Sequence, residues 1–377
     1  MTTVARRLLH DAVPAKPWNN PASWPAWRQL LPHVLVVTDP TRSADPHSND
    51  VPWLLHRAAA YLHTRGEPRP ARALYECTHQ LYRNLLGDDH PDTLASASNL
   101  AWNLRSLGEH QRARELDENT LTLYRRVLGE DHPSTLSAAS HLALDLRILG
   151  EHQRAHQLHA DTLIRRQRVL GDDHPSTLTS ANHLAADLRA LGEYQRAREL
   201  DEETLTRRHQ VLGEDHPDTL TSASNLAADL GALGEYQRAR ELDEETLTRQ
   251  RRVLGEDHPD TLTSASNLAF VLSALSEHQR AHQLCEDTLS RQRRVLGEDH
   301  PNTLISANNL AAVLRALGEH QQARQLDQDT LTHSRRVLGE DHPGTLTAAS
   351  NLAIDLQALG EHQQARQLEK WIKSQYR

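Results

Sequence analysis

The chain has 377 residues, of which 37% are hydrophobic and 25% charged, a balance typical of soluble folded proteins and not of disordered or membrane-spanning ones. Its formal net charge of -9 disfavours nucleic-acid binding, because affinity for phosphates comes mainly from excess positive charge. Aromatic residues make up only 4% of the chain, so leucine and alanine must form most of the core.

Several other classes of protein are disfavoured by missing patterns. No lysine follows a glycine, so the chain lacks a phosphate-binding GxxxxGK[ST] loop, and we expect no cofactor. Cys77 and Cys285 are the only cysteines, too few for a disulfide framework. The first residues lack the apolar stretch of a signal peptide, and no apolar run approaches bilayer length. We therefore expect a cytoplasmic protein without membrane contact.

Residues 1–47 differ in composition from the rest of the chain. They contain Trp18, Trp24 and Trp27 together with several prolines. We interpret them as a separate N-terminal helical cap or connector.

The remainder, residues 48–377, is built from an internal repeat. A His-Pro pair recurs every 42 residues, from His90 to His342, and the sequence between the pairs is nearly copied. A period of this length indicates a solenoid of stacked units. Gly66 aligns an earlier unit that lacks the His-Pro pair, which gives about eight units, starting near residues 48, 90, 132, 174, 216, 258, 300 and 342.

The unit that spans 90–131 predicts two helices. Pro91 suits a first helical turn, apolar residues follow at spacings of three and four, and Gly108 supplies a helix end. A second apolar series runs from Ala113 to Leu128. Each unit is thus a helix-turn-helix hairpin, and the fold class is all-α.

The register Leu100, Ala101, Leu104, Gly108, Ala113 resembles the tetratricopeptide repeat (TPR), and the 42-residue period with Asn-Leu-Ala in the first helix resembles the kinesin light chain variety. The resemblance implies a right-handed superhelical solenoid whose concave groove binds proteins or peptides without catalysis. One departure is Asp117, which stands at a second-helix position where the family often has an aromatic residue.

A second resemblance concerns the N-terminal region. The segment from Trp24 to Leu35 and the following Trp53-Leu54-Leu55 are similar to the connector between the repeats and the nucleotide-binding part of bacterial NB-ARC (STAND) ATPases. This implies, as an alternative, a ligand-sensing array that acts with an ATPase supplied in trans, or a truncated form of such a protein.

The helical wheel of the first helices separates the leucine and alanine face from a second face that the TPR resemblance places in the groove. One column there is rich in amides: Asn99, His141, His183, Asn225, Asn267, Asn309 and Asn351. A column at its edge contains Arg105, Arg147, Arg189 and Arg315. Amides match peptide groups and guanidinium groups match carboxylates, so we expect a peptide ligand that is acidic or has a free carboxylate. These arginines are expected to contact ligand and not to stabilise the fold.

Trp102 and Phe270 interrupt a column of small residues in the same groove, and we expect them to anchor an apolar ligand side chain. The units 174–215 and 216–257 differ at only seven positions, which include Asn182/Ser224, His183/Asn225 and Arg189/Gly231. These three pairs lie in the groove columns. The alternative interpretation is that exposed positions vary freely.

A metal-dependent enzyme is a more distant alternative. His152, His156 and His159 share one helix face, and His278, His282 and Cys285 repeat the arrangement. These clusters differ from the other units by only one or two substitutions in a histidine-rich repeat, and no nucleophile-and-base arrangement accompanies them. We therefore expect no metal site and no enzyme activity.

Overall fold

The computed structural model describes residues 2–14, 23–39 and 50–375, and these residues form helices joined by short turns. Trp18 is not among the described residues, and neither are the other parts of residues 1–47 that these ranges omit. The chain forms two compact units, Met1–Glu151 and His152–Arg377, which are considered separately below.

The first unit contains the N-terminal helices and the first hairpins. Its helices are α1 (Thr2–Ala12), α2 (Trp24–Val37), α3 (Asp50–Thr64), α4 (Pro68–Leu86), α5 (Pro91–Ser106), α6 (His110–Leu128) and α7 (Pro133–Ile148).

The second unit contains the remaining repeats. Its helices are α8 (His152–Leu170), α9 (Pro175–Ala190), α10 (Tyr194–Leu212), α11 (Pro217–Ala232), α12 (Tyr236–Val253), α13 (Pro259–Ala274), α14 (His278–Val295), α15 (Pro301–Ala316), α16 (His320–Val337), α17 (Pro343–Ala358) and α18 (His362–Gln375).

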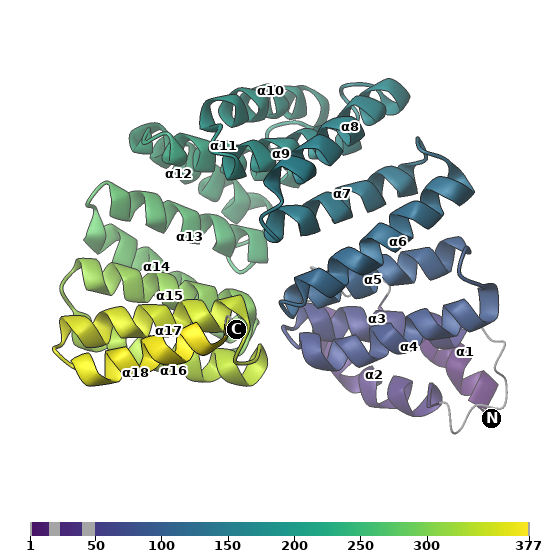
Figure 1. Cartoon of the computed structure of the whole chain (residues 1–377), viewed down its shortest axis with the longest axis horizontal. Helices are drawn as coiled ribbons and strands as arrows, with labels where there is room; N and C mark the ends of the chain where they lie inside the picture. Colours follow the sequence, from purple (N-terminus) through teal and green to yellow (C-terminus); the bar gives the residue numbers. More distant parts are fainter. Residues whose placement is uncertain (1, 15–22, 40–49, 376–377) are drawn as a thin grey trace. The chain divides into compact units, whose positions relative to one another are not determined.

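Within each unit, consecutive helices pack as antiparallel hairpins that stack on one another (Figure 1), which confirms the predicted helix-turn-helix repeat. The first helix of each repeat in the second unit is α9, α11, α13, α15 or α17. These first helices also contact one another from hairpin to hairpin. Among the described residues, the second helices make few or no such contacts. The first helices therefore line the inner side of this unit.

Each first helix after α3 begins with the His-Pro pair. The Nδ1 atom of His90 accepts a hydrogen bond from the backbone N–H of Asp92 at 3.2 Å, and His216 caps α11 in the same way through the N–H of Asp218. The imidazole takes the part that Ser, Thr, Asp or Asn usually plays, satisfying an N–H that the helix leaves unpaired. The histidines thus have a structural role at the helix starts.

The first helices end on a residue in the left-handed backbone region. Gly234 ends α11 with φ 78°, whereas at the equivalent end of α13 the residue is Ser276, with φ 62°. Ser276 is the one non-glycine residue with positive φ in the described part of the chain. A side chain at this conformation is strained because its Cβ approaches the backbone.

We expect Ser276→Gly to raise the free energy of unfolding by about 1 kcal/mol, by removing this strain. The reverse exchange, Gly234→Ser, should lower it by a similar amount. Chemical denaturation of both variants measures the effect, and a loss of stability in Ser276→Gly would contradict it.

The N-terminal helices pack against the first hairpin. Trp27 of α2 is fully buried and stacks on Tyr61 of α3, with ring centroids 5.6 Å apart. Arg6 of α1 is also buried, and its Nε donates to the carbonyl of Val37 at 3.1 Å. We propose that these helices form a cap on the first hairpin; the boundary expected near residue 47 lies outside the described residues.

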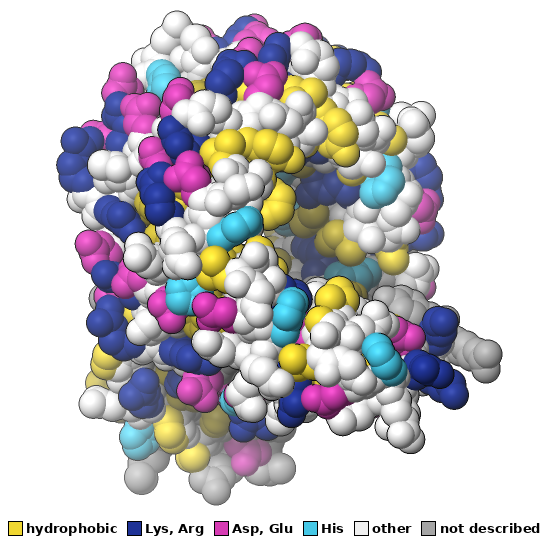
Figure 2. All heavy atoms as spheres, turned by 90° about the vertical axis from the view of Figure 1, so that its left-hand side faces the viewer, with side chains coloured by type: hydrophobic (Ala, Val, Ile, Leu, Met, Phe, Trp, Pro, Cys, Tyr) yellow, Lys and Arg dark blue, Asp and Glu magenta, His cyan; other side chains and the backbone are white. Residues whose placement is uncertain are grey.

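Arginine–carboxylate pairs tie the exposed second helices together. Pairs separated by 37 residues link one hairpin to the next: Arg72–Glu109, Arg114–Glu151, Arg198–Glu235, Arg240–Glu277 and Arg324–Glu361. Figure 2 shows acidic and basic side chains interspersed over the surface. Exposed pairs of this kind contribute little individually, on the order of 0–1 kcal/mol.

None of the helices in the described ranges combines the length and the hydrophobicity needed to cross a lipid bilayer.

Candidate ligand groove

The asparagines of the amide column from Asn225 onward lie on the inner side of the second unit. Asn267 of α13 is exposed, and Asn225 of α11 and Asn309 of α15 are half-buried. The carboxamides of these three residues make no hydrogen bond within the described part of the chain. Asn351 of α17 makes only a long hydrogen bond, 3.4 Å, to Asn308. The amide groups are therefore available to a ligand.

The remaining members of the column are less available. Asn99 of α5 donates to the carbonyl of Ala95 at 2.9 Å. His141 and His183 are half-buried, and the ring of His183 lies 5.3 Å from that of His159.

The two aromatic residues that the sequence predicts in the groove differ in exposure. Phe270 of α13 is 68% exposed. Trp102 of α5 is 38% exposed, and its ring stacks on His63, with centroids 3.5 Å apart. Phe270 is thus the more accessible anchor for an apolar ligand group.

The arginines of the neighbouring column do not line an open groove. Arg105 is buried, and its Nη1 donates to Asp117 Oδ2 at 2.7 Å and to Asp145 Oδ1 at 3.0 Å. Asp117 lies on the second helix of the same hairpin and Asp145 on the first helix of the next. Arg105 therefore joins three helices, and our expectation that it contacts ligand is wrong for geometric reasons.

The same arrangement, here called the Arg-Asp-Asp triad, recurs twice in the second unit. Arg189 pairs with Asp201 at 3.2 Å and with Asp229 at 2.7 Å. Arg315 pairs with Asp327 at 2.6 Å and with Asp355 at 3.2 Å. The aspartates of both triads are fully buried. Arg189 and Arg315 consequently stabilise the stack and are not available as ligand-binding guanidinium groups. Arg147 is half-buried at the corresponding position of α7.

The triad follows a spacing that the sequence already contains. Its members lie at positions i, i+12 and i+40, and where the arginine is absent the third member is also replaced. Three sets lack the arginine and also have another residue in place of the third aspartate: His63-Tyr75-Asn103, Gly231-Asp243-Val271 and Ser273-Cys285-Val313. The covariation of the first and third positions is the signal that could have identified the triad from sequence.

One guanidinium shared by two buried carboxyl groups cannot offset the desolvation of both. Burial raises the pKa of Asp117 and of Asp201 to about 7 and that of Asp327 to about 8, with Arg105, Arg189 and Arg315 opposing the shift. One carboxyl group of each triad therefore changes its protonation state near neutral pH.

The histidine clusters do not form a metal site. Within the described ranges, no three His, Cys, Asp or Glu side chains come close enough to hold a metal ion. His159 Nδ1 instead lies 2.5 Å from Asp187 Oδ2, and His159 occupies the sequence position that the i+12 aspartate of a triad takes in other hairpins. Cys285 is buried in an apolar cluster, which raises the pKa of its thiol to about 11.

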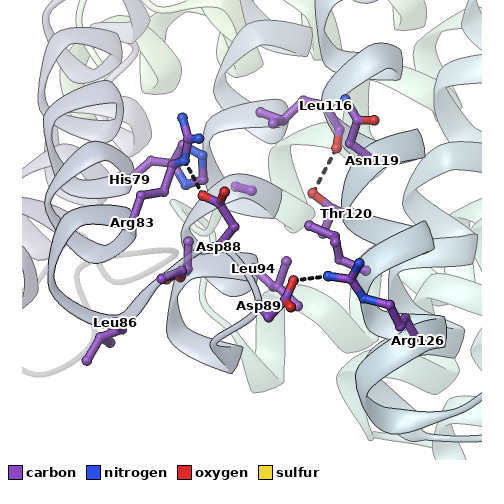
Figure 3. A pocket seen from close by; sticks show the side chains of 14 residues that line it. His79, Arg83, Leu86, Asp88, Asp89, Leu94, Leu116, Asn119, Thr120 and Arg126 are labelled. Carbon is purple, nitrogen blue, oxygen red and sulfur yellow. Dashed lines mark hydrogen bonds and ion pairs between the residues drawn. The ribbon is translucent and has the colours of Figure 1, made fainter.

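A cavity of about 670 Å³ lies in the first unit, among α4, α5 and α6 (Figure 3). Its side chains form ion pairs with one another, Arg83 with Asp88 and Arg126 with Asp89. Smaller crevices occupy equivalent positions of other hairpins, lined for example by Thr177 and Arg207. Because they recur with the repeat, we attribute these crevices to the stacking of the hairpins.

Family models described as tetratricopeptide repeat match this chain along most of its length. One model matches residues 53–92, 93–134 and 135–176, and another matches 157–208, 177–248, 218–293, 265–332 and 305–372. The chain belongs to the tetratricopeptide repeat family. A comparison with curated protein sequences gave no match.

Solved structures similar to this TPR protein include three of different origin. A putative kinesin light chain from Podosopora anserina is 32% identical, with a TM-score of 0.47 over 54% of this chain and 96% of its own. The apo quorum sensor NprR from B. thuringiensis is 13% identical, with a TM-score of 0.56 over 94% of this chain and 97% of its own. A STAND protein with a TPR sensor from Pyrococcus horikoshii is 13% identical, with a TM-score of 0.50 over 94% of this chain and 52% of its own.

Proposed function

We propose that this TPR protein is a non-catalytic scaffold that binds an extended peptide or protein segment along the inner face of its second unit. The observation that carries the proposal is the row of unpaired carboxamides of Asn225, Asn267 and Asn309. They lie one hairpin apart on α11, α13 and α15.

A carboxamide offers one acceptor and two donor hydrogens, so each can bond both the N–H and the C=O of a peptide group. A row of such groups favours an extended main chain over a compact ligand. Phe270, between Asn267 and the end of α13, adds an apolar contact on the same face.

An acidic ligand is not part of this proposal. That expectation rested on the arginine column, and Arg105, Arg189 and Arg315 are paired with internal carboxylates. A catalytic function is not part of it either, because the residues that carry the proposal are amides, which are poor proton donors and acceptors in catalysis.

The test begins with peptides selected from a display library on the purified protein, whose Kd is then measured by calorimetry. The triple change of Asn225, Asn267 and Asn309 to Ala should weaken binding at least about tenfold, because each lost hydrogen bond costs about 0.5–1.5 kcal/mol. The melting temperature should change little.

A matched control is available on the outer helices. Gln237, Gln279 and Gln321 are exposed amides one hairpin apart on α12, α14 and α16. Their change to Ala should leave the Kd unaltered. Equal weakening by both triple variants, or none by the asparagine variant, would refute the groove assignment.

A second candidate function is the sensor array of a STAND-type ATPase. It is favoured by the N-terminal helices, where Val4 and Leu8 of α1 and Val36 of α2 are exposed although α1 and α2 are packed on α3. If an NB-ARC ATPase encoded by the same or an adjacent reading frame binds the purified array, changing Leu8 and Val36 to Ser should abolish that binding. Unchanged binding would exclude these helices as the contact.

A further inference from the structure

Asp201 and Asp243 occupy equivalent positions on α10 and α12, but their surroundings differ. Asp201 accepts hydrogen bonds from Asn182 Nδ2 at 2.7 Å and from Arg189 Nη1 at 3.2 Å. Around Asp243 the equivalent residues are Ser224 and Gly231. Ser224 instead contacts the hydroxyl of Ser264 at 3.1 Å.

The third partner is replaced as well. Asp229, which completes the triad around Arg189, corresponds to Val271 of α13 in the next hairpin. The units 174–215 and 216–257 are otherwise nearly identical, so the two residues that bond Asp201 and the aspartate that completes its triad have been replaced around Asp243, while the aspartate itself remains.

Asp243 is therefore a buried acid without an internal partner. It is 1% exposed, its Oδ1 is buried with no hydrogen-bond partner, and its carboxylate makes no hydrogen bond to any described residue. Burial raises its pKa to about 7. Leaving such a group unpaired is costly, which points to a partner outside the chain.

The position of the missing guanidinium is open. A Cβ built on Gly231 would meet no atom within 4 Å. At the equivalent positions, Arg189 and Arg315 are only partly buried while their aspartates are fully buried, so a guanidinium group reaches the carboxyl from the inner face. The exposed ring of Phe270 lies next to Val271 on α13.

We propose that Asp243 binds the guanidinium group of an arginine side chain that a peptide ligand inserts over Gly231, with Val271 and Phe270 as the apolar walls. This inference rests on the proposed peptide-binding function and specifies one ligand residue. The ligand arginine supplies the group that Arg105, Arg189 and Arg315 supply in other hairpins.

Arginine fits this position better than lysine for two reasons. Its planar guanidinium group can donate two N–H bonds to one carboxylate, as required for a single acid. It is also less strongly hydrated than an ammonium group and packs on aromatic and apolar surfaces, such as those of Phe270 and Val271.

The probe for this site is Nα-acetyl-arginine amide, compared with Nα-acetyl-lysine amide at equal ionic strength and slightly alkaline pH. The melting temperature of the intact protein is followed as each probe is titrated. The arginine probe should raise it with an apparent Kd at least about tenfold lower than that of the lysine probe.

Three variants make the result specific. Asp243→Asn should remove the response to arginine, and Gly231→Arg should remove it while raising the melting temperature of the protein alone. Gly231→Ala is the control for the added Cβ, and the melting temperature of this variant should still rise with the arginine probe. A response in Asp243→Asn equal to that of the wild type, or equal effects of the two probes, would overturn the inference.

These experiments distinguish a failure of the arginine site from a failure of the proposed peptide-binding function. If selected peptides depend on the asparagine row but neither contain arginine nor respond to Asp243→Asn, only the arginine site is refuted. If the arginine probe binds through Asp243 but peptide affinity is unaffected by the asparagine changes, the groove assignment fails and the arginine site stands.

Discussion

Arg105→Ala is expected to destabilise the protein by about 3–5 kcal/mol, because it leaves the carboxyl groups of Asp117 and Asp145 buried without a cation. This is more than a typical surface arginine contributes and comparable with the loss of a large core side chain. Urea unfolding of the variant measures the change in free energy.

The chain supplies its own control for this experiment. Joint replacement of Arg105 by Ser, Asp117 by Cys and Asp145 by Val copies the set Ser273-Cys285-Val313, which is found at the equivalent position of another hairpin. Most of the lost stability should return, since replacing all members of a buried ionic group by apolar residues is often neutral. If Arg105→Ala has the stability of the wild type, the triad does not hold the hairpins together.

Stability should fall as the pH rises from about 5 to about 9. The pKa of Asp117 and of Asp201 in the folded protein is about 7 and that of Asp327 about 8, above the 3.8 of an aspartate in an unfolded chain. The folded state thus binds more protons than the unfolded state within this interval, and it loses that advantage as the carboxyl groups ionise. The contribution is complete below about pH 4 and is lost through about pH 8. Thermal unfolding across this range should show a decrease of several degrees.

Asp327→Asn tests the origin of this dependence. It leaves Arg315 with one carboxylate, that of Asp355, so the variant should lose less stability than the wild type between pH 5 and pH 9. Glu298→Gln, at an exposed acid, is the control and should follow the wild type. A pH profile of Asp327→Asn identical to that of the wild type would show that the triads do not titrate in this range.

The helices and the repeat were predictable from sequence because their signals are local. The His-Pro pair, the apolar spacing and Gly108 lie within one helix or turn, and the same pattern is repeated along the chain. The cap formed by the His90 imidazole was not predicted, since histidine is not among the usual capping residues.

The inner face was predicted only in part, for a physical reason. A helical wheel places a residue on a face but does not say how far its side chain reaches, and a long arginine near the edge of the face can extend into the hairpin interface. Arg105, Arg189 and Arg315 do this, whereas Asn267, with a short side chain, remains at the surface. The buried acids that attract these arginines lie on other helices, so their proximity depends on tertiary structure.

Because the triads are unevenly distributed, the joints between hairpins of the second unit should differ in their stability at alkaline pH. The hairpin joint at Ser273-Cys285-Val313 contains no carboxyl group in the place of a triad, and its residues Cys285 and Val313 belong to an apolar cluster that extends from Leu247 to Ala323. In stacked repeats each joint contributes separately, so segments can melt one at a time. As ionisation weakens the flanking joints, the segment α13–α15 is expected to be the last to lose protection against amide hydrogen exchange.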